Sequence, residues 1–152
     1  MDKKKQFVHN GIERMELSEY LSSELKRSGY AGMSLEETAH GMQIIIRSEK
    51  PGMVIGSGGK NIRKLTKEIE ERFSYDDVSI DVQEVNNPKL EPDIVSHKLA
   101  QSLERGWYYR RAGMTIAEEV MDNGAQGVQI IFSGKLMGAR SSVEKFNRGY
   151  IK

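Results

Sequence analysis

The feature that most constrains the fold is a cluster of three glycines within four positions, Gly56-Ser57-Gly58-Gly59. A short segment with apolar residues precedes this cluster, and it begins at Pro51, a residue that suits the first turn of a helix. After the cluster, apolar residues recur at intervals of three and four from about Asn61 to Phe73, which predicts an amphipathic helix with a charged outer face. The chain must therefore pass from a short helix to a longer one through a tight glycine loop.

The residues before this loop predict a helix and a pair of strands. An N-terminal arm is expected over residues 1–15, because no periodicity precedes Glu16. From Glu16 apolar residues repeat at helical spacing, and Gly29 stands where a helix would end. Two short segments within residues 31–47 predict a β-hairpin with its turn at His40-Gly41, the second segment being apolar and β-branched.

After the long helix, the sequence predicts the end of one domain and the start of another. Apolar and polar residues alternate over residues 78–82, which is typical of a half-buried strand. The first domain is therefore expected to span residues 16–86. Residues 87–92 contain two prolines and are predicted to be a linker.

The second domain is expected over residues 93–152 and has fewer clear elements. One helix is predicted from Pro92 and another that ends at Asn123-Gly124. Val128 to Phe132 alternate as a strand, with no partner strand evident in the sequence. An isolated strand cannot satisfy its own backbone, so this domain is predicted to be incomplete. The expected fold class is α+β. The first domain is expected to be followed by a small α/β domain of two helices and a partial sheet.

Composition excludes several classes of protein. No apolar run approaches membrane-spanning length, and the N-terminus has no signal-peptide pattern, so a cytoplasmic protein without a membrane partner is expected. The absence of cysteine excludes disulfides and cysteine zinc sites, and the scattered His9, His40 and His97 share no ligand spacing, so no metal or other cofactor is expected. The formal net charge is only +1, so any positive surface for nucleic acid must be local.

Two nucleotide-binding motifs can be tested against the glycine cluster, and both fail. A Walker A loop would need glycine at Val54 and a hydroxyl residue at Asn61. A Rossmann fingerprint would need a third glycine at Asn61, and it would follow a strand rather than a proline-started helical turn. Neither ATP hydrolysis nor dinucleotide binding is therefore predicted.

A GXXG loop between two helices remains, and such a loop clamps the backbone of about four nucleotides of single-stranded nucleic acid. Glycines permit close approach of a sugar-phosphate backbone, and the helix that follows points its amides toward phosphates. No acidic residue occurs from position 50 to 67, where the predicted RNA-contacting residues lie: Lys50, Gly56, Ser57, Gly58, Gly59, Lys60, Arg63, Lys64 and Lys67. The alternative is a joint between two helices that happens to be rich in glycine.

A second basic region contains Arg105, Arg110 and Arg111. Arg110 and Arg111 differ by about 100° around a helix, so at least one should reach solvent or phosphate. The structural alternative is that they brace the second domain through Glu118, Glu119 or Asp122. The neighbouring aromatic residues 107–109 are expected to pack in a core rather than to stack on bases. Four further cations form either an RNA contact or a solvated surface: Lys135, Arg140, Lys145 and Arg148.

The predicted order of elements resembles a type II KH domain. The resemblance extends beyond that domain, because Glu49–Gly56, Gly124–Gly127 and Ser133–Arg140 are similar to the S-three family of small-subunit ribosomal proteins. Glu104–Ala112 and Val143–Lys152 resemble the archaeal branch of that family. The likeness covers nearly the whole chain.

This resemblance implies a structural protein of the small-subunit head. The implied partners are small-subunit ribosomal RNA, messenger RNA at its entry path and neighbouring small-subunit ribosomal proteins, with no small-molecule substrate. The arginines at 105, 110 and 111 match the region near the entry path, although Met114 stands where bacterial relatives carry a lysine. Archaeal members normally continue with a strand-rich stretch, so a C-terminally truncated chain is expected.

Two other classes of function compete with this one. A free-standing regulatory KH protein would share the glycine loop but would not need a second domain. Cleavage of DNA at abasic sites, credited to some eukaryotic relatives, needs an amine nucleophile with a lowered pKa. No lysine here lies in an apolar segment, and no catalytic set of residues is evident, so an enzyme is not predicted.

Overall fold

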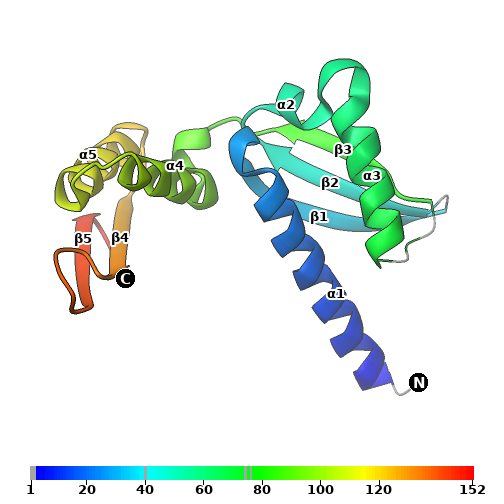
Figure 1. Ribbon diagram of the computed structural model, residues 1–152, viewed down its shortest axis with the longest axis horizontal. Helices are drawn as coiled ribbons and strands as arrows, with labels where there is room; N and C mark the ends of the chain where they lie inside the picture. Colours follow the sequence, from blue (N-terminus) through cyan, green and yellow to red (C-terminus); the bar gives the residue numbers. More distant parts are fainter. Residues whose placement is uncertain (1–2, 40, 74, 76) are drawn as a thin grey trace. The chain divides into compact units, whose positions relative to one another are not determined.

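The chain folds into two compact units, which meet in the sequence at Asn86 and Asn87 (Figure 1). The computed structural model describes residues 3–39, 41–73, 75 and 77–152. Each unit has its own sheet and its own buried apolar cluster. Among the described residues no helix is long and apolar enough to span a membrane.

The first unit is a three-stranded sheet with helices on one face (Figure 1). Its elements in chain order are α1 (Lys3–Glu24), β1 (Tyr30–Thr38), β2 (Gly41–Ser48), α2 (Pro51–Ile55), α3 (Lys60–Phe73) and β3 (Ser79–Glu84). The sheet order is β1-β2-β3, with β2 antiparallel to β1 and parallel to β3. The parallel pair requires a crossover, which α2, the glycine loop and α3 provide.

The core of this unit lies between the sheet and the two longer helices. Ile44 and Ile46 of β2 are fully buried, because alternate residues of a strand point to the same face. Leu17 and Leu21 of α1 and Ile69 of α3 meet them from the other side. Burying each such side chain stabilises the fold by about 1.5–3 kcal/mol, so these contacts hold both helices on the sheet.

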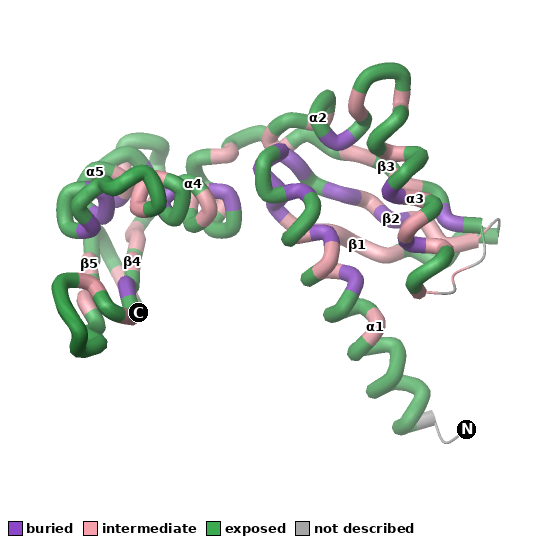
Figure 2. Tube along the Cα trace, in the orientation of Figure 1, coloured by how far each residue is buried: buried purple, intermediate pink, exposed green. Residues whose placement is uncertain are grey.

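The first helix is longer than predicted. It begins at Lys3 rather than near Glu16, and most of its N-terminal half is exposed (Figure 2). Phe7 and Met15 are 82% and 61% exposed, so the apolar residues there do not continue the core-facing stripe of the second half. The expected arm of residues 1–15 is therefore helical from Lys3 on. Met1 and Asp2 lie outside the described residues.

The predicted hairpin is confirmed, with Thr38 paired to Gly41 across its end. His40, which was assigned to the turn, lies outside the described residues. The strand predicted at residues 78–82 is also confirmed, as β3, although it begins one residue later. The two helices around the glycine loop begin and end close to their predicted positions.

The second unit packs a helical hairpin on a two-stranded sheet. Its elements are a 3-10 turn, η3 (Pro88–Leu90), α4 (Pro92–Glu104), α5 (Tyr109–Asp122), β4 (Gly127–Gly134) and β5 (Ser142–Gly149). The residues predicted to form a linker contain η3, which packs on α4 and belongs to this unit. Leu99, Tyr109, Ala112 and Phe132 form its buried cluster, with Phe146 against it.

The prediction that β4 lacks a partner strand is wrong. β5 pairs antiparallel with β4, and Ile130 lies opposite Phe146. Only one face of this sheet meets α5, so β5 needs apolar residues at alternate positions only, and Phe146 is its one half-buried apolar side chain. Gly113 allows the close approach, because a Cβ atom there would lie 2.9 Å from the Phe132 ring.

Candidate nucleic-acid interface

The glycine loop has a backbone that only glycine adopts readily. Gly56, Gly58 and Gly59 have φ angles of 74°, 61° and 76°, in the left-handed region where a Cβ atom is strained. A side chain at Gly56 would also meet Asn61, 2.6 Å from its Cγ, whereas the space beside Gly58 is open for at least 4 Å. The loop therefore presents a face without side-chain bulk at its centre.

Hydrogen bonds brace this loop from both ends. The amide of Gly56 donates to the carbonyl of Gly52 at 2.9 Å, which closes α2. The side-chain amide of Asn61 donates to the carbonyl of Met53 at 3.2 Å and so ties the first turn of α3 to α2. These two bonds hold α2 and the first turn of α3 together on either side of the loop, and the N-terminal end of α3 comes directly after it. Asn61 was not among the predicted site residues, because its role depends on this tertiary contact.

The five predicted cations around the loop are all exposed: Lys50, Lys60, Arg63, Lys64 and Lys67. Four of them lie on α3 at intervals of three and four, so they share one side of that helix. Lys50 comes directly before α2. The structure therefore gathers the positive charge along the segment that leads into and out of the glycine loop.

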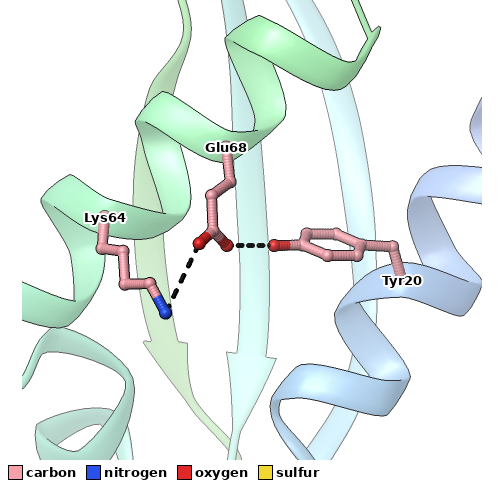
Figure 3. A network of polar contacts seen from close by, with 3 residues as sticks. All are labelled: Tyr20, Lys64 and Glu68. Atoms are coloured by element: carbon pink, nitrogen blue, oxygen red, sulfur yellow. Dashed lines mark hydrogen bonds and ion pairs between the residues drawn. The ribbon is translucent and has the colours of Figure 1, made fainter.

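Lys64 differs from the other four cations because a carboxylate holds it (Figure 3). Its Nζ lies 3.4 Å from Glu68, which also accepts a hydrogen bond of 2.5 Å from the hydroxyl of Tyr20 on α1. Burial and this hydrogen bond raise the pKa of Tyr20 above its usual range. The hydrogen bond from Tyr20 is also the main reason that the pKa of the Glu68 carboxyl falls below its usual value. Lys64 thus belongs both to the α1–α3 contact and to the row of cations along one side of α3.

The arginines of the second unit have different surroundings. The Arg110 guanidinium lies 3.6 Å from Glu144 of β5, donates to the Tyr109 hydroxyl at 3.0 Å and covers the ring of Tyr109. Arg110 therefore braces α5 on the sheet, through a carboxylate that the sequence did not suggest. Arg105 is the exposed residue that directly follows α4, and Arg111 lies on the exposed side of α5.

The aromatic residues beside these arginines divide between packing and exposure. Tyr109 is buried, so the packing prediction is confirmed for it. Trp107 and Tyr108 are 54% and 48% exposed, so that prediction is wrong for them. Their contrast could not be read from the sequence, because it depends on where α4 ends and α5 begins.

The remaining predicted cations are exposed but scattered. Lys135 and Arg140 lie at or after the end of β4, and Lys145 and Arg148 lie on β5. Among the described residues no group of three or more His, Cys, Asp or Glu could hold a metal ion. His9 instead pairs with Glu13 on its own helix, at 3.0 Å.

Comparison with known proteins assigns a class to each unit. A family model described as "KH domain" matches residues 16–90, and one described as "Ribosomal protein S3, C-terminal domain" matches residues 99–152. The type II arrangement agrees with the parallel β2–β3 pair and the α2–loop–α3 crossover. The chain is thus an α+β protein with a KH domain and a second small α/β domain.

Similar full-length proteins extend this assignment to the whole chain. Small ribosomal subunit protein uS3 of Natronomonas pharaonis is 56% identical over 97% of this chain and 48% of its own length. The uS3 protein of Haloarcula marismortui is 53% identical over 100% of this chain and 50% of its own length. The uS3 protein of Methanothrix thermoacetophila is 53% identical over 97% of this chain and 54% of its own length. The chain belongs to the uS3 family, archaeal type, and it spans about half the length of the curated relatives it matches.

Proposed function

We propose that this protein is a structural RNA-binding component of the small ribosomal subunit in the cytoplasm, with small-subunit ribosomal RNA as its main partner. Family membership supports this role, because its relatives are named as small-subunit ribosomal proteins. Neighbouring small-subunit ribosomal proteins are further proposed partners. The proposed role is architectural and needs no turnover.

The observation that carries this proposal is the geometry of the glycine loop. Its three left-handed glycines leave an open backbone face between two helices, and the cations of α3 follow directly. Such a face lets a sugar-phosphate backbone approach closely, while the helix end and the lysines attract its charge. The three glycines of the loop contribute no side-chain groups that could read a base, so binding here depends mainly on the backbone of the RNA.

The second unit is proposed to contact messenger RNA at its entry path. Arg105 and Arg111 are the proposed phosphate contacts, since a guanidinium fork suits phosphate oxygens. Arg110 is proposed to position α5 rather than to bind, because Glu144 and Tyr109 hold it. Met114 is 44% exposed on the same helix and adds no charge there. Scattered contacts to ribosomal RNA are proposed for Lys135, Arg140, Lys145 and Arg148.

The loop proposal is tested by replacing Ser57 and Gly58 together with Asp. Two carboxylates near the phosphates should weaken binding of a single-stranded RNA octamer by on the order of tenfold or more at low salt. The matched control is Asn10→Asp with Ala39→Asp, which adds the same charge at exposed positions within α1 and directly after β1, outside the glycine loop. Equal affinity of the two variants, with unchanged circular dichroism, would refute binding through the loop.

A further inference from the structure

A groove in the second unit lies between the two helices of its hairpin. This α4–α5 groove has a volume of about 360 Å³. Stripes of α4 and α5 form its two walls, η3 borders it, and the α4–α5 turn contributes Arg105 and Trp107. Val95, Ile116 and Val120 give it apolar walls. It is large enough for one nucleobase or one bulky side chain.

The charged groups around the α4–α5 groove are mainly positive. Lys89, Lys98 and Arg105 line it, against the single carboxylate of Glu119. Glu119 is already engaged by Lys89, at 3.0 Å. The groove therefore attracts an anionic ligand with an apolar or aromatic part. Neutral polar groups, among them Gln101 and Thr115, add hydrogen-bonding capacity beside the apolar walls.

Trp107 is held by its backbone while its side chain stays accessible. Its amide donates to the carbonyl of Ser102 at 3.0 Å, and the preceding Gly106 has a φ angle of 91°, which fixes the turn. Even so, the indole is 54% exposed, an unusual position for the largest aromatic side chain. An accessible indole beside cations, carried on a hydrogen-bonded backbone, is an arrangement on which single-stranded bases stack.

We propose that the α4–α5 groove takes one unstacked base of single-stranded RNA against Trp107, with Arg105 contacting the adjoining phosphate. This subsite deepens the proposed function and rests on the claim that the second unit binds RNA. Arg111 lies one turn before Thr115 on α5, so the subsite continues toward the proposed phosphate contacts. An acidic peptide with an apolar side chain would also complement the cations and the apolar walls of the groove. It would make less use of the exposed face of the indole.

The test uses the fact that the chain contains a single tryptophan. Its fluorescence is recorded while the protein carrying Ser57→Asp and Gly58→Asp is titrated with a single-stranded RNA octamer. Stacking on Trp107 should quench the fluorescence in a saturable way, although the glycine loop is disabled. An octamer of the same length without bases should bind through its phosphates with little quenching. Equal quenching by both octamers would overturn the subsite.

Substitution provides a second readout that does not depend on fluorescence. In the same background, Trp107→Ala should weaken octamer binding, measured by anisotropy of a labelled RNA, by about fivefold or more, and Trp107→Phe should retain most of the affinity. Tyr150→Ala, which removes an aromatic side chain that is 73% exposed elsewhere in this unit, should change little. If Trp107→Ala and Tyr150→Ala bind equally, the subsite is refuted.

The peptide alternative and failure of the proposed function give different results. A peptide of alternating glutamate and leucine that shifts the fluorescence, while the octamer does not, would overturn the RNA subsite and assign the groove to a protein. If the wild-type chain binds no RNA by anisotropy, the proposed function fails together with the subsite. RNA binding by anisotropy without any change at Trp107 refutes the subsite alone.

Discussion

At the scale of single residues, neighbouring side chains of one type have separate roles. Arg110 and Arg111 are adjacent in the sequence, yet the first contacts Glu144 and Tyr109 and the second lies on the exposed side of α5. Lys64 and Lys60 differ in the same way. Among the described residues, Glu68 forms an ion pair with Lys64 and not with Lys60. Neighbouring basic residues therefore differ in whether a carboxylate holds them, which separates the proposed RNA-binding residues from the proposed positioning residues.

The two arginines make this division testable. Arg111→Ala should lower the slope of log affinity against log salt by nearly one on duplex RNA, and by somewhat less on a single strand, with an unchanged Tm. Arg110→Ala should lower the Tm by a few degrees, because α5 loses its ion pair with Glu144 of β5, and should change the salt slope less. A lower Tm for Arg111→Ala, with an unaltered slope, would give that residue the architectural role instead.

At the scale of elements, the sequence predicted the helices and strands whose apolar residues all face one core. The glycine loop, α3, α4 and the β1–β2 hairpin follow directly from periodicity and turn residues. β5 did not, because one of its faces is solvated and Phe146 is its only half-buried apolar residue. The start of α1 was missed because its first half packs on no core. Asn61 and Glu144 act through tertiary contacts that no local pattern reveals.

The role of β5 can be measured by comparing two of its apolar residues. Phe146→Ala should reduce the free energy of unfolding by about 1–3 kcal/mol, less than for a fully buried ring, because it packs on Phe132. Val143→Ala should cost less than about 0.5 kcal/mol, since Val143 is 59% exposed. Chemical denaturation gives both values. Equal costs would show that β5 does not use Phe146 to close the second unit.

The contact between α1 and α3 should make stability depend on pH. Tyr20→Phe removes the hydrogen bond to Glu68 and should cost about 1 kcal/mol near neutral pH. The pKa of Tyr20 is raised by folding, so its contribution is complete below the ordinary tyrosine pKa of about 10 and is lost as pH rises above it. The pKa of Glu68 is lowered, so its contribution is present above about 4.5 and is lost as pH falls further.

Stability curves of the wild-type protein and Tyr20→Phe against pH check this account. The stabilities of the two proteins should differ most between about pH 4.5 and about pH 10, and the two curves should converge below and above that range. A constant difference across the whole range would mean that the hydroxyl of Tyr20 has no titrating partner in the folded protein, which would remove the role given to Glu68.

At the scale of the whole molecule, two units are each proposed to offer RNA a separate surface. The first presents a glycine loop for the sugar-phosphate backbone, and the second presents Arg105, Arg111 and the α4–α5 groove. The formal net charge of +1 shows that these surfaces depend on local arrangement rather than on an overall basic character. A structural protein of the small subunit needs such separate contacts, whereas a free-standing regulator needs only the loop.

The central claim is that the glycine loop contacts ribosomal RNA in the small subunit. The direct measurement places a photoreactive amino acid at Ser57 in protein incorporated into small-subunit particles, with Asn10 as the matched control position. We predict that the chain stays with the particles at high salt and that Ser57 crosslinks to small-subunit ribosomal RNA more strongly than Asn10 does. Release of the chain from the particles by salt, or crosslinks from Ser57 to protein alone, would contradict the account.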